Sequence, residues 1–194
     1  MRFSNKEIKD LAIAGLLISL AFAVLLSGGI TSLLSFNVNF LFIFVIAFFT
    51  AGIGFLLHEL MHKYVAQKYG LHAEFRAFYF MLLLAIFFSL FGFIVAAPGA
   101  VFISGLVTRE RNGKVSLAGP LTNIVLAILF LIPLIFISNG ILKSLFDFGL
   151  TINALLAAFN MIPFMPFDGS KIIAWNKTVY WITAVIAVGL FVAG

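Results

Sequence analysis

Long apolar runs separated by short polar gaps dominate this chain of 194 residues. A helix needs about 20 apolar residues to cross the ~30 Å hydrocarbon core of a bilayer, and several runs approach that length. These runs are residues 11–27, 40–57, 77–97, 117–137, 148–164 and 178–194. The pattern therefore predicts an all-α polytopic membrane protein with six hydrophobic segments.

The composition indicates that lipid rather than water surrounds the chain. It is 63% hydrophobic and only 10% charged, whereas a soluble domain has about 25% charged residues. The chain contains no Cys, which excludes disulfides, thiolate metal sites and cysteine nucleophiles. The net charge of +5 comes from Lys and Arg in the polar gaps and not from one continuous basic face. We therefore expect no nucleic-acid partner.

The polar gaps are too short to hold an additional soluble domain. We therefore expect residues 1–194 to form a single intramembrane domain, with no appended soluble regulatory domain. The longest gap, residues 108–116, contains the dipeptide Asn112-Gly113, which favours a turn. Together with the β-prone residues 101–103, this gap predicts a small β-hairpin or extended segment.

One apolar run continues into a cluster of ionisable residues, His58-Glu59-Leu60-Met61-His62. Residues four apart lie on one face of a helix, so both imidazoles can bind a single metal ion. Glu59 follows the first histidine, where it can take a proton from a metal-bound water. The cluster comes after 18 uncharged residues, and ionisable groups at membrane depth are costly unless they have a function. The pattern therefore predicts a zinc site in the membrane.

Asp168 is the acidic residue best placed to complete this site. A hydrolytic zinc centre has three protein ligands and one position open for water. Asp168 follows an apolar segment in which Pro163 and Pro166 would interrupt a helix, and broken backbone at membrane depth is tolerated where it lines a cavity. An ordinary Asp-Gly turn is the alternative interpretation. The other acidic residues are expected to meet solvent (Glu7, Asp10, Asp147) or to pair with nearby arginines (Glu74, Glu110).

Together these motifs resemble the site-2 protease family of intramembrane zinc metalloproteases. The H-E-x-x-H cluster lies on one predicted membrane helix, and a later one carries N-x-x-P-x-x-x-x-D-G from Asn160 to Gly169. A third segment, Ala118-Gly119-Pro120-Leu121-Thr122-Asn123, is similar to the A-G-P-L segment that opens the family's next core helix. The resemblance covers roughly residues 40–173.

The resemblance implies an activity and a set of site residues. It makes His58, His62 and Asp168 the ligands of one Zn²⁺ per chain and Glu59 the general base, and it places Asn160 beside the site as a hydrogen-bonding helper to substrate or oxyanion. It implies a zinc metalloendopeptidase that hydrolyses peptide bonds in or near transmembrane segments, in regulated intramembrane proteolysis. The expected partners are transmembrane protein or peptide substrates and membrane lipid.

Two features depart from the family pattern. The D-G-G-R often seen in the family reads Asp168-Gly169-Ser170-Lys171 here, which should alter packing more than chemistry. The apolar run 77–97 stands where a short β-rich segment is expected. Beyond it, an extended edge near residues 97–102 could receive an unwound substrate by strand addition, although a plain loop is an equal alternative.

The zinc site and the basic residues predict the same topology. His62 and Asp168 lie near the ends of the second and fifth runs, so those ends must face one side. This requires the run 77–97 to enter the membrane and return, by a re-entrant hairpin or a helix with an extended return, which leaves five spanning segments. Eleven of the 12 Lys and Arg residues then lie on the cytoplasmic side with the N-terminus, and only Lys143 lies outside, as the positive-inside rule expects.

Other functions fit the residues less well. A membrane zinc protease of a different class would need a downstream Glu ligand on a helix, and no apolar run after His62 contains one. A metal transporter would not need Glu59 beside its ligands, and a catalytically silent scaffold would not be expected to retain it. The remaining histidine, His72, lies in a polar gap and is expected to be solvated.

Overall fold

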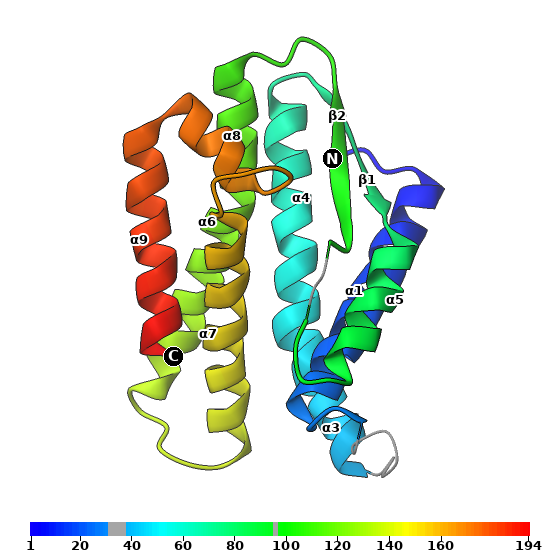
Figure 1. The fold of residues 1–194 in the computed structure, drawn as a ribbon, viewed down its shortest axis with the longest axis vertical. Coiled ribbons are helices and arrows are strands. Elements are labelled where there is room, and N and C mark those ends of the chain that lie inside the picture. The colour runs from blue at the N-terminus through cyan, green and yellow to red at the C-terminus, as the bar shows by residue number, and fades with distance from the viewer. Residues whose placement is uncertain (31–37, 95–96) are drawn as a thin grey trace. The chain divides into compact units, whose positions relative to one another are not determined.

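A computed structural model of the chain describes residues 1–30, 38–94 and 97–194. These residues form helices and one two-stranded sheet (Figure 1). They divide into two compact units, residues 57–73 with 103–194 and residues 2–56 with 74–102, which we call unit 1 and unit 2. The elements in chain order are α1 (Asn5–Leu26), α3 (Val38–Ala47), the π-helical turn η1 (Phe48–Gly52), α4 (Ile53–Lys68), β1 (His72–Ala77), α5 (Tyr79–Ser89), β2 (Gly99–Ser104), α6 (Arg109–Leu134), α7 (Ile141–Asn160), α8 (Asp168–Trp175) and α9 (Lys177–Ala193).

Four helical segments are long and apolar enough to cross a bilayer. They are Asn5–Leu26, the continuous helix Asn39–Lys68 that joins α3, η1 and α4, and α6 and α7. The helices α5 and α9 are apolar but shorter. The protein is therefore an integral membrane protein, as predicted. The expected number of five spanning segments stays a prediction, as does the single domain.

Small residues allow the helices of unit 2 to approach closely. A Cβ added at Gly15 would lie 2.9 Å from Leu56 Cδ1, and one added at Gly52 would lie 3.3 Å from the Gly15 carbonyl oxygen. Ser19, one turn after Gly15, is fully buried and donates to the Gly15 oxygen at 2.6 Å. Such small residues are the usual contact surface between membrane helices, where no hydrophobic effect draws helices together.

Within unit 2, α5 follows β1, and the chain comes back to the sheet at β2. Helix α5 has 11 residues, about 16 Å at 1.5 Å per residue, which is too short to cross a bilayer. It ends in a turn at Gly92, whose φ of 87° suits glycine. The Phe78 N–H then donates to the Pro98 carbonyl at 3.0 Å, and β2 pairs with β1. Phe78 and Pro98 are therefore adjacent, as an excursion without net crossing requires. The excursion itself stays a prediction, and residues 95–96 of the predicted segment lie outside the described residues.

Glu7 and Asp10 do not meet solvent, contrary to the prediction from the sequence. They are only 0% and 3% exposed. Glu7 accepts a hydrogen bond from the Phe75 N–H at 2.9 Å, and Asp10 accepts from the Ala77 N–H at 3.4 Å and the Tyr79 hydroxyl at 2.5 Å. The two carboxylates, one helical turn apart on α1, thus bind the two N–H groups that point from one edge of β1.

The predicted hairpin at residues 108–116 is wrong. Thr108 is the N-cap of α6, with its hydroxyl accepting from the Arg111 N–H at 3.2 Å, and the residues after it are helical. Residues 101–103 do form a strand, but its partner is β1. The glycine of Asn112-Gly113 serves packing instead of a turn, because a Cβ at Gly113 would lie 2.6 Å from Trp175 Cγ.

In unit 1, α6 packs against α7 and α8, and α7 packs against α9 (Figure 1). Small and branched apolar side chains fill the contacts, with Ile124, Ala157 and Ala187 in one buried cluster. A second cluster of Met161, Ile172 and Tyr180 holds α8 against the end of α7. This packing matters for the site because Asp168 is the first residue of α8.

Candidate metal centre

Helix α4 presents two imidazoles from neighbouring turns. His58 and His62 are four residues apart, and their Nε2 atoms lie 3.0 Å from each other. The helix ends at Lys68, followed by Gly70 in the left-handed region at φ 72°, a conformation in which glycine commonly ends a helix. Both rings are buried, with 5% and 7% of each residue exposed.

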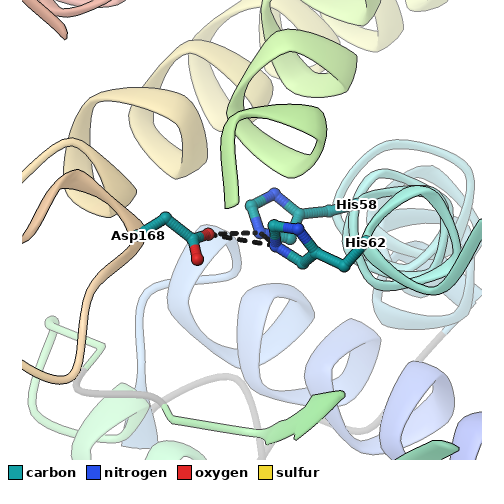
Figure 2. Close-up of side chains that lie close together, drawn as sticks. All are labelled: His58, His62 and Asp168. Carbon is teal, nitrogen blue, oxygen red and sulfur yellow. Dashed lines mark hydrogen bonds and ion pairs between the residues drawn. The ribbon is translucent and has the colours of Figure 1, made fainter. Parts of the chain in front are cut away.

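Asp168 reaches the same point from α8. The chain leaves α7 at Asn160 and carries Pro163 and Pro166 before α8 begins at Asp168. Asp168 Oδ2 lies 3.4 Å from His58 Nε2 and 3.0 Å from His62 Nε2, as the dashed lines in Figure 2 show. The next residue is Gly169, where a Cβ would lie 2.6 Å from the Ile162 carbonyl oxygen. The Asp-Gly pair therefore serves close packing that aims the carboxylate at the histidines.

The other ring nitrogens show which atoms could bind a metal. His58 Nδ1 lies 2.6 Å from Asn123 Oδ1, and His62 Nδ1 lies 2.8 Å from the Val115 carbonyl oxygen. A carbonyl oxygen only accepts hydrogen bonds, so in a neutral His62 the proton is on Nδ1 and the Nε2 lone pair is free. With His58 in the same tautomer, two lone pairs and a carboxylate oxygen converge where no proton separates them.

The spacing of these atoms fits a tetrahedral metal ion. Metal–nitrogen bonds of about 2.0–2.1 Å place the ligand atoms of a tetrahedral site about 3.3–3.4 Å apart. The three donor pairs here are separated by 3.0, 3.0 and 3.4 Å. His58, His62 and Asp168 are the one group of three or more potential ligands that meets within the described parts of the chain. These residues could therefore hold a Zn²⁺ ion with one position open.

Gly119 leaves the space in which the imidazoles sit. A Cβ at this position would lie 2.5 Å from His62 Nε2 and 2.6 Å from His58 Cε1. The residue belongs to the segment 118–123, which lies inside α6 and not at its beginning, because α6 starts at Arg109. This segment brings the backbone of α6 against the histidines.

Charges around Asp168 favour its ionised form. Burial alone would raise its pKa, but the imidazoles of His62 and His58, in their protonated form, lower it well below the usual range. Lys171, one turn along α8, lies with its Nζ 3.5 Å from Asp168 Oδ1, the oxygen that does not face His62. The carboxylate thus presents one oxygen to the histidines and the other to a cation.

Glu59 and Asn160 are placed differently from each other. Glu59 is buried, with 8% exposed, directly after His58 on α4. Asn160 is half-buried at the end of α7, and its Nδ2 donates to the Leu156 carbonyl of its own helix at 2.9 Å. Its role as a helper to the substrate stays a prediction.

Two buried asparagines, which the sequence motifs do not assign to the site, are connected to it. Asn123 Oδ1 contacts His58, and Asn123 Nδ2 donates to Asn153 Oδ1 at 3.0 Å. Both asparagines are 0% exposed, on α6 and α7. The available signal was an amide residue inside each of two otherwise apolar runs, where an unused polar side chain is costly.

The remaining candidates have local partners away from the donor group. Arg76 Nη2 lies 2.8 Å from Glu74 Oε1, which confirms that pair. Glu110 pairs with Lys114 one turn later instead of with the arginines beside it. His72 is exposed, as expected.

Two relatives give evidence for the family and the metal that does not depend on the geometry of the site. The chain is 43% identical over 191 residues to the protein named "Putative zinc metalloprotease MJ0611" of Methanocaldococcus jannaschii, covering 97% of this chain and 94% of the relative. It is 30% identical over 171 residues to "Zinc metalloprotease MJ0392" of the same organism, covering 87% of this chain and 45% of that protein. No family model and no solved structure matches the chain. The similarity over almost the whole of the first relative shows that the chain belongs to the same family as these zinc metalloproteases, with zinc as its metal, which is consistent with the resemblance to site-2 proteases.

Proposed function

We propose that this chain is an intramembrane zinc endopeptidase that cleaves peptide bonds in or near transmembrane segments of membrane proteins. The observation that carries the proposal is the convergence of His58, His62 and Asp168 within helices that are apolar enough to cross a bilayer or directly follow one. A buried carboxylate, Glu59, stands beside the first histidine. A soluble protease would have no need to build its site from such helices.

The reaction is the hydrolysis of a peptide bond by water. Zinc bound by His58, His62 and Asp168 would polarise the scissile carbonyl and lower the pKa of a bound water. Glu59 accepts a proton as the water oxygen bonds to the carbonyl carbon, and returns it to the amide nitrogen as the C–N bond breaks. Because Glu59 is buried, bulk water does not compete with the reacting water for its carboxylate. The Asp168 oxygen that does not face the histidines, Oδ1, lies near Lys171.

The proposed topology places the N-terminus and the site end of α4 on the cytoplasmic side. The supporting observations are the 11 of 12 basic residues that then lie inside and the hydrogen bond from Phe78 to Pro98, which closes the excursion at its base. A substrate helix must unwind before cleavage, because its peptide groups are hydrogen-bonded within the helix.

The test combines zinc content with single-turnover cleavage of a transmembrane peptide by the full chain in detergent. Glu59→Gln should keep one zinc per chain and lose cleavage, because the ligands remain while proton transfer does not. Glu110→Gln, on the exposed surface of α6, serves as the control and should cleave normally. Normal turnover by Glu59→Gln would refute the assignment of the base.

A further inference from the structure

A line of three hydrogen bonds runs through unit 1 and ends at His58. Asn153 Nδ2 donates to the Gly149 carbonyl oxygen at 2.9 Å, and Asn123 Nδ2 donates to Asn153 Oδ1 at 3.0 Å. Asn123 Oδ1 then lies 2.6 Å from His58 Nδ1. The line connects α7, α6 and α4, which are far apart in the sequence.

The first acceptor of this line fixes the direction of every later bond. The Gly149 carbonyl can only accept, so the Asn153 amide must present its NH₂ group there and its oxygen to Asn123. Asn123 must then donate to that oxygen, which turns its own oxygen toward His58. An oxygen facing His58 Nδ1 requires the proton on Nδ1, and the lone pair is left on Nε2, the atom that faces His62 and Asp168.

We propose that Asn123 and Asn153 are positioning residues for the metal, which together hold His58 in the tautomer and ring orientation that presents Nε2 to zinc. This inference rests on the metal site proposed above. Asn123 acts directly on His58, while Asn153 acts on it only through Asn123 and touches no proposed ligand. A metal-bound histidine usually donates its second N–H to an oxygen that fixes its tautomer. In this chain the acceptor is a neutral amide whose own orientation is set by a second amide.

The burial of Asn123 and Asn153 argues that these two polar residues have a role and are not there by chance. Both side chains are 0% exposed within helices apolar enough to cross a membrane. Hydrogen bonds between helices could make the pair a simple link between α6 and α7. A link of that kind would contribute to the stability of the fold, but it would not change the affinity for zinc. The affinity therefore separates the two roles.

The test is a double-mutant cycle read out as zinc affinity of the full chain in detergent, by competition with a chromophoric chelator. Asn123→Leu keeps the size but removes the acceptor, and should weaken zinc binding by about 10–100-fold. Asn153→Leu should weaken it less. The double variant should match Asn123→Leu, because Asn153 has no path to the metal once Asn123 is gone.

Thr122→Val is the matched control. Thr122 adjoins Asn123, but its hydroxyl donates to the Ala118 carbonyl of the same helix at 2.8 Å, so its zinc affinity should equal that of the unaltered chain. Unchanged zinc affinity in both asparagine variants would overturn the proposal, as would losses that multiply in the double variant. If Asn123→Leu does not fold, weakened zinc binding by Asn153→Leu supports the proposal and unchanged binding overturns it. Because zinc binding is measured without any peptide, a failure of the proposed peptidase activity would be seen separately.

Discussion

Gly119→Ala should remove the metal site while changing only one methyl group. The added Cβ would lie 2.5 Å from His62 Nε2 and 2.6 Å from His58 Cε1, where a normal contact begins near 3.4 Å. Neither ring can retreat freely, because each Nδ1 is held by a hydrogen bond of 2.8 Å or less. The methyl group would therefore occupy the space in which the two Nε2 atoms converge.

The magnitude follows from two opposing effects. Gly→Ala inside a helix normally stabilises by about 0.5–1 kcal/mol because the unfolded chain loses freedom. Overpacking of a filled interior costs about 1–3 kcal/mol. The net change in the free energy of unfolding should therefore be a small loss for the zinc-free chain. Zinc affinity should fall far more, because both proposed histidine ligands must move to relieve the overlap.

The assay is zinc stoichiometry together with thermal unfolding in detergent, measured with and without zinc. Gly189→Ala is the matched control, since Gly189 lies in α9 with no atom within 4 Å of an added Cβ. The control should bind one zinc and unfold at the same or a higher temperature. If Gly119→Ala binds zinc as tightly as the control, the described approach of α6 to the histidines is refuted.

Three further predictions concern the third ligand, the topology and the buried acids. Asp168→Ala should sharply lower zinc occupancy measured by elemental analysis, because one ligand in three is lost; retention of zinc there, with release by Glu74→Ala, would show that the ligand is misassigned. Single cysteines replacing His72 and Leu106, both exposed, should be labelled from one face of intact vesicles, and a cysteine replacing Asn139 should be labelled from the other face. Labelling of the first two positions from opposite faces would refute the excursion of residues 77–97. Asp10→Ala should lower the free energy of unfolding by about 1–3 kcal/mol, because the Ala77 N–H and the Tyr79 hydroxyl lose their acceptor. The control is Glu110→Ala, at an exposed position. If Asp10→Ala unfolds at the same temperature as this control, the prediction is wrong.

The predicted parts of the site depended on short-range spacing. His58 and His62 converge because a helix places residues four apart on one face, and that requires no knowledge of the rest of the fold. Asp168 was identified because two prolines beside an apolar run are a local signal of broken backbone. The return of residues 77–97 without a net crossing stays a prediction, which two independent constraints, the metal site and the basic residues, both require.

The parts that were missed depended on contacts between distant segments. Glu7 and Asp10 follow a basic start and precede an apolar run, which locally resembles a solvated helix end. They are buried where α1 meets β1, through hydrogen bonds to residues 68 and 67 positions later in the chain. The Asn112-Gly113 dipeptide favours a turn in isolation, yet Gly113 is needed as a gap for Trp175. In each case a tertiary contact gives the residue an environment that differs from the one its local sequence favours.

For Asn123 and Asn153, burial between apolar helices makes the role of each amide easier to infer from the structure. In a soluble core, an amide can bond to ordered water and reveals little about its purpose. Between apolar helices, Asn123 and Asn153 must find partners in the protein, so the direction of each hydrogen bond is determined by its neighbours. The sequence shows only that each asparagine is an amide inside an apolar run; their pairing across α6 and α7, and the contact with His58, come from the fold. The cost of burying polar groups in lipid therefore makes them evidence of function.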